Sequence, residues 1–322
     1  MRTLRRLGYL ALVIGFAQVV FGAIVRITGS GLGCGTHWPD CYGSFTPTPN
    51  APNLLVEITH RYGAAALSLA IVALAIFAWM RRSESGVDGR GGVLRPSLLA
   101  LLLVIVAAVF GAVTVKMELA TGVVVTHLAI AMSLLAVLVV IVVRAGGFGS
   151  PAITARSPRT FRSGRAAVGL TFLALVLGAL TANTPGAPIA CQGFPLCRVI
   201  AEHGTPLWIQ VTHRIMAFLL LLHLIGIIMG VKKRAEPGPI RSAAWAALSI
   251  VVLQILIAAA MVEMHLPASL RSLHQAVGTA LWISVVVLTA LASGYGRSAA
   301  TSDLARESPA RGEFATPEGV ST

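Results

Sequence analysis

The sequence predicts an all-α membrane protein in which eight transmembrane helices form two four-helix bundles related by a parallel repeat. Three observations predict this class. Of 322 residues, 56% are hydrophobic and only 11% are charged, which is too apolar for a soluble fold and long enough for eight spans of about 20 residues. The basic residues collect in alternate loops, and the motif Thr59-His60-Arg61 returns 153 positions later as Thr212-His213-Arg214.

Hydropathy predicts the eight spans near residues 7–25, 57–80, 96–115, 122–143, 166–183, 208–230, 242–262 and 271–293. The first span follows three arginines and resembles a signal peptide. No small-residue cleavage site precedes Arg26, so we interpret this span as a retained helix.

The formal net charge is +13, and the basic residues that produce it are concentrated in alternate loops. Nineteen of the 25 Lys and Arg residues lie at the N-terminus, in 81–95, 144–165 and 231–241, and in the C-terminal tail. By the positive-inside rule, both termini of a multi-pass protein of the cell membrane are then cytoplasmic. The basic charge reflects membrane topology, and no nucleic-acid partner is expected.

All four cysteines fall on the outer side of the predicted topology, as the pairs Cys34 with Cys41 and Cys191 with Cys197. Two disulfides that close short outer loops are one interpretation, because the outer compartment is oxidising. A redox-active or haem-handling pair is the alternative. The spacings do not fit a usual zinc site.

The polar segment 145–165 separates two halves that match each other. Met117 and His127 repeat as Met264 and His274 with the same ten-residue interval. Four spans per half give both halves the same orientation, which predicts a parallel repeat. We therefore expect a bundle over 1–144, a cytoplasmic linker over 145–165, a second bundle over 166–296 and a disordered cytoplasmic tail over 297–322.

Four histidines lie inside spans near their outer ends and form repeat-equivalent pairs, His60 with His127 and His213 with His274. Two histidines on facing helices can ligate a planar macrocycle from both faces, so haem ligation is the favoured interpretation. A proton relay is the alternative. His223 and His265 are secondary candidates. Basic side chains at the outer ends can meet haem propionates, or extend to the membrane interface: Arg26, Arg61, Lys116, Arg214 and Arg271.

One difference separates the two half-sites, because Glu57 in the first half corresponds to Gln210 in the second. A carboxylate one turn from a histidine can move protons or stabilise positive charge, and an amide cannot. This contrast predicts chemistry in the first half, with Glu57 as a catalytic residue, and a six-coordinate electron-transfer haem in the second. The alternative role of Glu57 is a helix-start residue, favourable by about 0.3–1 kcal/mol.

The pattern resembles the haem A synthase family. The residues that carry the resemblance are Val25-Arg26-Ile27-Thr28-Gly29-Ser30-Gly31-Leu32-Gly33-Cys34, Trp38-Pro39-Asp40-Cys41, Glu57-Ile58-Thr59-His60-Arg61, Thr126-His127 and Leu273-His274-Gln275. The resemblance covers about residues 8–293. It implies eight helices, a haem b cofactor in the C-terminal bundle and a haem O substrate in the N-terminal bundle, whose methyl group is oxidised to the formyl group of haem A for cytochrome oxidase.

That activity implies membrane lipid, an electron donor of unspecified identity and haem O synthase as partners. A bis-histidine di-haem cytochrome b in quinone-linked electron transfer is the alternative function. It is disfavoured because both histidine pairs lie near the outer face, whereas electrons that cross a membrane need a haem near each side. A transporter of two parallel repeats would explain the symmetry but not the four placed histidines.

Overall fold

Eight long helices make up the fold in a computed structural model that describes residues 1–47 and 51–294. They are α1 (Arg2–Ile27), α2 (Pro52–Met80), α3 (Leu94–Lys116), α4 (Thr121–Arg144), α5 (Pro158–Asn183), α6 (Thr205–Lys233), α7 (Gly238–Glu263) and α8 (Ala268–Ala292). Short elements accompany them: η1 (Ser150–Ala152), η2 (Ala187–Ile189), β1 (Cys191–Gln192) and β2 (Val199–Ile200), the last two paired antiparallel. All eight helices are long and apolar enough to cross a membrane, so the predicted all-α fold with eight spans is confirmed.

The helices extend beyond the apolar segments that predicted them, chiefly at their beginnings. Proline occupies the first turn of α2 and of α5, where its missing N–H costs no intrahelical hydrogen bond. As a result α5 begins at Pro158, inside the segment expected to be a linker. The connection between the halves therefore ends at Ser157 rather than at residue 165. The expected boundary at 296 and the tail 297–322 lie outside the described residues.

The turn after α3 and the turn after α7 have the same backbone geometry. Glu118 and Leu119 have φ of 49° and 64°, and His265 and Leu266 have φ of 58° and 62°. The amide of Leu119 bonds to the carbonyl of Thr114 at 2.9 Å, and the amide of Leu266 bonds to that of Met261 at 2.8 Å. These matched turns support the repeat, which itself stays a prediction.

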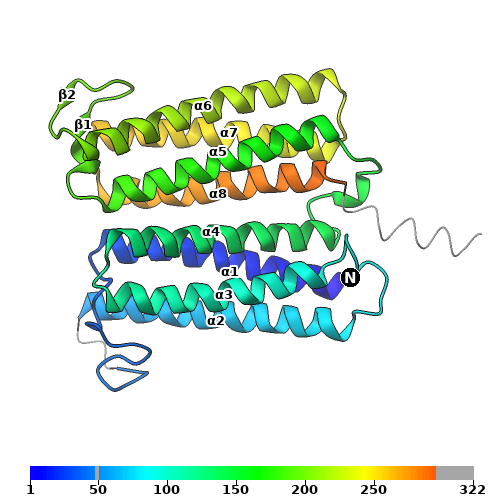
Figure 1. Cartoon of the computed structure of the whole chain (residues 1–322), viewed down its shortest axis with the longest axis horizontal. Coiled ribbons are helices and arrows are strands. Elements are labelled where there is room, and N and C mark those ends of the chain that lie inside the picture. The colour runs from blue at the N-terminus through cyan, green and yellow to red at the C-terminus, as the bar shows by residue number, and fades with distance from the viewer. Residues whose placement is uncertain (48–50, 295–322) are drawn as a thin grey trace, which may run out of the picture.

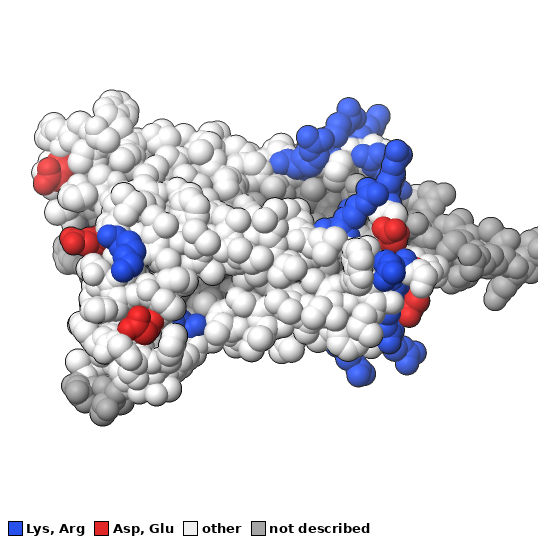
Figure 2. Space-filling model, turned by 60° about the horizontal axis from the view of Figure 1, so that its bottom comes forward, with Lys and Arg blue, Asp and Glu red and all other residues white. Residues whose placement is uncertain are grey.

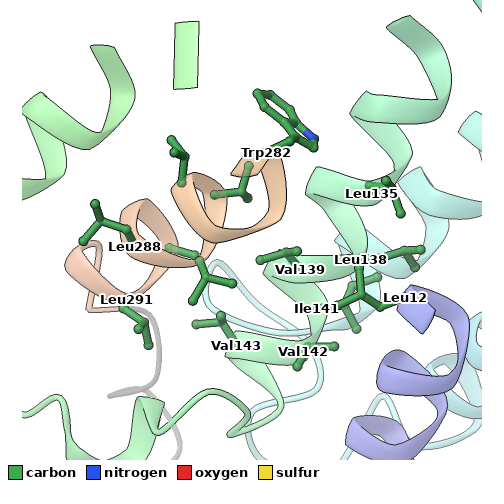
Figure 3. Close-up of a cluster of buried hydrophobic side chains, with 14 of the residues drawn as sticks. Leu12, Leu135, Leu138, Val139, Ile141, Val142, Val143, Trp282, Leu288 and Leu291 are labelled. Atoms are coloured by element: carbon green, nitrogen blue, oxygen red, sulfur yellow. The ribbon is translucent and has the colours of Figure 1, made fainter. Parts of the chain in front are cut away.

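Helices α1–α4 form one group and α5–α8 a second. The two groups face each other mainly through α4 of the first and α8 of the second (Figure 1). The apolar core runs through this contact, where Val139 of α4 points toward α8, while Leu135 and Leu138 lie on the other side of α4, toward Leu12 of α1 (Figure 3). Trp282 Nε1 donates a buried hydrogen bond to the carbonyl of Met132 at 2.8 Å. The two halves therefore pack against each other along α4 and α8, and large apolar side chains remain exposed on the other helices.

Charge marks the two ends of the molecule differently. Lys and Arg side chains gather at the end that carries the start of α1 and the connections α2–α3, α4–α5 and α6–α7, whereas few lie along the apolar middle (Figure 2). The two cysteine loops lie at the opposite end (Figure 1). This sorting is the one that the positive-inside rule uses.

Candidate functional site

A disulfide closes the loop between α1 and α2. Cys34 and Cys41 are bonded with their Cα atoms 5.0 Å apart, and both side chains are buried. The same loop ends in a short bridge between Cys41 and Ser44. Cys191 and Cys197 form the corresponding disulfide between α5 and α6, also with Cα atoms 5.0 Å apart. Each half thus carries a covalently closed cap at the end opposite the basic connections.

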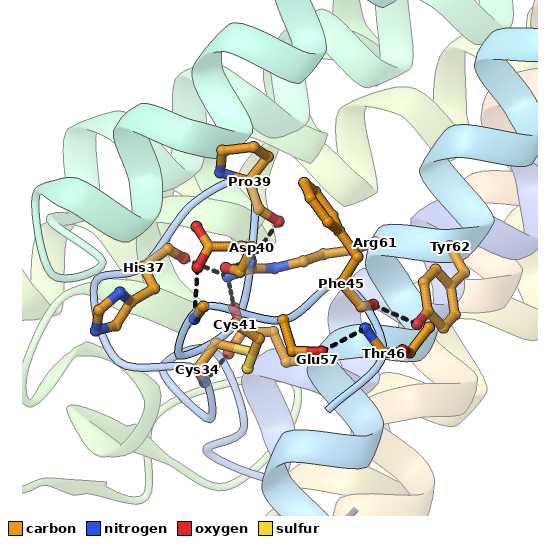
Figure 4. Close-up of a disulfide and its surroundings, with 12 residues drawn as sticks. Cys34, His37, Pro39, Asp40, Cys41, Phe45, Thr46, Glu57, Arg61 and Tyr62 are labelled. Atoms are coloured by element: carbon orange, nitrogen blue, oxygen red, sulfur yellow. Dashed lines mark hydrogen bonds and ion pairs between the residues drawn. A yellow bond between two sulfur atoms is a disulfide. The ribbon is translucent and has the colours of Figure 1, made fainter. Parts of the chain in front are cut away.

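Glu57 holds the first cap onto α2. Its Oε2 accepts a hydrogen bond from the backbone N–H of Cys34 at 2.8 Å, and its Oε1 forms an ion pair with Arg61 (Figure 4). Arg61 also donates to the carbonyls of His37, Pro39 and Asp40, at 2.9–3.2 Å. Glu57 is only 4% exposed. The carboxylate is therefore buried, paired and connected directly to the disulfide loop.

Gln210 makes the equivalent bond in the second half. Its Oε1 accepts from the backbone N–H of Cys191 at 2.6 Å, while its amide nitrogen donates to the carbonyl of Pro188 at 3.2 Å. Arg214 donates to carbonyls of the cap, including Gly193 at 2.7 Å. These two contacts between a helix and its disulfide loop differ in one respect. Glu57 also forms an ion pair with Arg61, whereas Gln210 also donates to the carbonyl of Pro188.

The histidines of the first half are His60 on α2 and His127 on α4. A Cβ added to Gly22 would lie 2.9 Å from His60 Nε2, and one added to Gly111 would lie 3.5 Å from His127 Cε1. These glycines leave room for the imidazoles. Gln18 donates to the His60 carbonyl at 2.8 Å, and His127 Nδ1 is buried with no hydrogen-bond partner among the described residues.

His213 of α6 and His274 of α8 line one cavity of about 370 Å³ in the second half. Gly178 faces His213 as Gly22 faces His60, since an added Cβ would lie 2.9 Å from His213 Cε1. His213 Nδ1 lies 2.9 Å from the carbonyl of Ala174. A carbonyl only accepts, so Nδ1 carries the proton and Nε2 of the neutral ring keeps its lone pair. This is the nitrogen that a metal ligand needs.

Two arginines complete this cavity, and one of them comes from the other half of the chain. Arg26, at the end of α1, and Arg271, at the start of α8, both line it. Arg26 Nη1 donates to the carbonyl of Ala182 on α5 at 3.2 Å. Arg214 also lines the cavity, although its guanidinium holds the cap, and Arg61 does not line it. The sequence repeat did not predict that Arg26, on a helix of the first half, lines a cavity of the second half.

The residues of this cavity fit a haem. It supplies two imidazoles from different helices, an apolar wall and the guanidinium groups of Arg26, Arg214 and Arg271. A volume of about 370 Å³ is within the range of about 300–1,000 Å³ for ligand sites. His274 Nδ1 and Gln254 Oε1 are buried there without hydrogen-bond partners among the described residues, which is typical of a polar site built for a ligand.

The two secondary histidines are placed elsewhere. His223 Nε2 bonds to the carbonyl of Ser163 at 2.9 Å and joins α6 to α5, which is a structural contact. His265 lines a smaller outer pocket of about 210 Å³, together with Arg198 and Glu263, which form an ion pair. Gln254, which sequence reasoning missed, contacts His274 directly.

Fold and site together define a multi-pass membrane protein whose second half encloses a cavity between two imidazoles. Residues 5–286 match the COX15-CtaA family, described as cytochrome oxidase assembly protein, and the chain belongs to this family. The family predicted from the sequence is confirmed.

Its relatives include haem A synthases from several bacteria. The protein of Alkalihalophilus pseudofirmus is 30% identical over 63% of this chain and 68% of its own length. That of Halalkalibacterium halodurans is 29% identical over 78% and 83%. That of Staphylococcus haemolyticus is 28% identical over 88% and 92%. These matches support haem A synthase and do not support the quinone-linked cytochrome b alternative.

Proposed function

We propose that the chain is a membrane haem A synthase that oxidises a methyl group of haem O to the formyl group of haem A for cytochrome oxidase assembly. The observation that carries the proposal is the match to the COX15-CtaA family over residues 5–286, in a fold with one histidine pair in each half. Haem O is the substrate, and a haem b held by His213 and His274 would supply electron transfer.

The two halves take different roles. The first half, 1–144, holds haem O between His60 and His127, and the second half, which begins with α5 at Pro158, holds haem b. The contrast between Glu57 and Gln210 supports this division, because only the first half has a buried carboxylate beside its histidine. Glu57 acts there by carrying negative charge as the methyl group loses electrons and protons.

The arginines at the outer end receive the propionates of haem b. Arg26, Arg214 and Arg271 line the cavity, but Arg214, like Arg61, donates to carbonyls of the caps. Charge-assisted bonds from guanidinium to carboxylate are geometrically specific, so two arginines at one edge fix which way a propionate-bearing macrocycle enters. Arg26 also brings the first half into the binding site of the second.

The protein lies in the cell membrane with its basic end in the cytoplasm, which places both termini there and both disulfides outside. An electron donor and haem O synthase are its partners. The sorting of Lys and Arg in Figure 2 supports this orientation.

The test is chemical. The full chain is purified from cells that lack their own haem A synthase, with and without a haem O synthase, and the haems are extracted and separated. We expect haem A only when haem O is supplied. Protein that holds haem b but forms no haem A from available haem O, in aerated cells with an intact respiratory chain, would contradict the proposal.

A further inference from the structure

We propose that Glu263 anchors the second disulfide loop to α7, and that it thereby holds Phe194 of that loop in the wall of the cavity, where Phe194 retains haem b. Glu263 is the last residue of α7, and Phe194 lies between the two cysteines of the loop. Glu263 is then a positioning residue, because it acts through Phe194. The inference rests on the proposed function, in which His213 and His274 hold haem b as a resident cofactor.

The anchor consists of two contacts that one carboxylate makes. Glu263 Oε1 accepts a hydrogen bond from the backbone N–H of Phe194 at 3.0 Å, and Oε2 forms an ion pair with Arg198. The Arg198 side chain crosses the loop over Gly193, where an added Cβ would lie 2.7 Å from Arg198 Nε. Gly193 has a φ of 94°, which favours glycine. The loop therefore brings two donors to the end of α7.

The side chain of Phe194 forms part of the cavity wall. Its ring packs against that of Phe218 on α6, with the ring centroids 6.0 Å apart, and both residues line the cavity. This distance is typical of a favourable aromatic pair. Phe194 is thus held from two sides, by α7 through its backbone and by α6 through its ring. A loop fixed in this way keeps an apolar side chain against an apolar ligand.

The disulfide loop of the first half corresponds to this loop residue by residue. Each contains an aromatic residue followed by proline, and the second cysteine comes two residues after the proline. An arginine of α2 or α6 donates to the carbonyls on either side of the aromatic residue, which are those of His37 and Pro39 in the first loop and of Gly193 and Pro195 in the second. Trp38 therefore corresponds to Phe194.

The residues of the anchor are nevertheless absent from the equivalent positions of the first half. The replacements are Lys116 for Glu263, Tyr42 for Arg198 and Ala65 for Phe218. A lysine ammonium has no lone pair, so Lys116 cannot accept a hydrogen bond from the loop. Trp38 is 41% exposed, whereas Phe194 is half-buried. The second anchor is thus specific to the half proposed to keep its haem, and the other half must release its product.

The anchor also separates the cavity from the smaller pocket of about 210 Å³. Glu263 and Arg198 line the smaller pocket, and Phe194 lines the cavity of about 370 Å³. Three residues line both spaces: Pro188, Val262 and Leu266. Release of Glu263 from the loop would free Phe194 and join the two spaces, which opens a route from the cavity to the capped end. The anchor therefore sets how slowly haem b leaves.

The rate of haem b loss tests the anchor. The full chain carries His60→Ala and His127→Ala, so that one histidine pair remains, and the purified haem b form is mixed with excess apomyoglobin. Glu263→Lys, which copies the first half, and Phe194→Ala should each lose haem b about five- to tenfold faster than this parent, the effect of one hydrogen bond or one partly buried ring. Glu263→Gln keeps an acceptor for the Phe194 N–H and should remain closer to the parent.

Two matched controls lie in the same cap. Glu202→Lys makes the same charge change at an exposed residue, and Leu196→Ala removes a 79% exposed side chain two residues from Phe194. Both should lose haem b at the parental rate. The unfolding temperature of the haem-free Glu263→Lys chain should stay close to the parental value, because both groups of the ion pair are partly exposed. A fall that matches the faster haem loss would mean general destabilisation and would overturn the inference.

Parental rates of haem b loss in both Glu263→Lys and Phe194→Ala would also overturn it, as would equal acceleration in the two controls. His213→Ala in the same background keeps this inference distinguishable from the proposed function. If His213→Ala releases haem b at the parental rate, the assignment of the ligands is wrong. If it releases haem b rapidly while Glu263→Lys and Phe194→Ala match the parent, only the anchor is wrong.

Discussion

The carboxylate of Glu57 accepts a hydrogen bond from the backbone of Cys34 at 2.8 Å, and so joins the entrance of the first bundle to a disulfide loop. Gln210 and Cys191 are joined in the same way at 2.6 Å. An amide side chain is therefore sufficient for this hydrogen bond to the disulfide loop. What Glu57 adds is negative charge, balanced by Arg61.

Glu57→Gln tests what that charge does. The variant should keep the hydrogen bond to Cys34, because Gln210 makes the same bond to Cys191, and it should bind haem b normally. It should form little or no haem A, because an amide can neither transfer protons nor carry negative charge. The measurement is haem A formed per haem-b-loaded chain. Tyr62→Phe, which loses one bond to the loop at Phe45 but no charge, is the control and should remain active. Near-parental activity of Glu57→Gln would leave Glu57 a purely structural residue.

The first disulfide should be present in the isolated protein and should stabilise the outer cap. Without reductant, neither Cys34 nor Cys41 should react with a thiol reagent. Replacing both by Ser, with the second disulfide intact, should lower stability by about 2 kcal/mol, the entropy expected for a loop of this length. Thermal unfolding followed with the labelling measures both effects. Ready labelling of both cysteines in protein kept under air would contradict the prediction.

Glu236, in the turn between α6 and α7, should make stability depend on pH. Burial raises the pKa of Glu236, but hydrogen bonds from Ser157 and Thr160, both at 2.5 Å, and from Arg234 outweigh it, so the net pKa is lowered. A lowered folded-state pKa stabilises the protein above the unfolded value of about 4.3, and this contribution is lost as the pH falls through the folded-state pKa.

Glu236→Gln should therefore unfold at a lower temperature than the parent near neutral pH, by the equivalent of about 1–3 kcal/mol, and the gap should close in acid. Unfolding midpoints across pH measure this. Glu84→Gln, at an exposed ion pair with Arg81, is the control and should show almost no effect. A gap of constant size at every pH would mean that the charge of Glu236 is not involved.

Arg26 and Arg271 should each be needed to retain haem b. Arg26→Leu and Arg271→Leu remove a cation from the cavity edge, so we expect haem b to be lost to an acceptor protein about tenfold faster. Lys116→Leu removes an exposed cation outside the cavity and should change nothing. If the lysine variant loses haem b as fast as the arginine variants, general charge rather than a specific contact explains the effect.

The sequence was sufficient for the eight helices, because each span is a long apolar run and the basic loops alternate. It was less accurate at helix starts. Arg159, Arg162 and Arg165 are too polar to belong to a span, yet they are helical, because α5 begins at Pro158 outside the apolar segment.

The repeat also singled out the four histidines and the pair Glu57 and Gln210, since it compares each residue with its repeat-equivalent position. It did not predict that both side chains accept a hydrogen bond from a cysteine N–H. It had no means of finding contacts between halves. Arg26 was placed in the first half by its position in the chain, although its side chain reaches the cavity of the second. Gln254 was overlooked because its image is Ala107, and a single glutamine in an apolar helix gives no pattern.

The division of roles between the halves is tested most directly by removing one histidine pair at a time and extracting the haems. We expect the protein with His60→Ala and His127→Ala to keep haem b and its bis-histidine spectrum but to form no haem A. The protein with His213→Ala and His274→Ala should lose that spectrum and its tightly held haem b. Retention of the full haem b spectrum without His213 and His274, or its loss without His60 and His127 alone, would contradict the assignment.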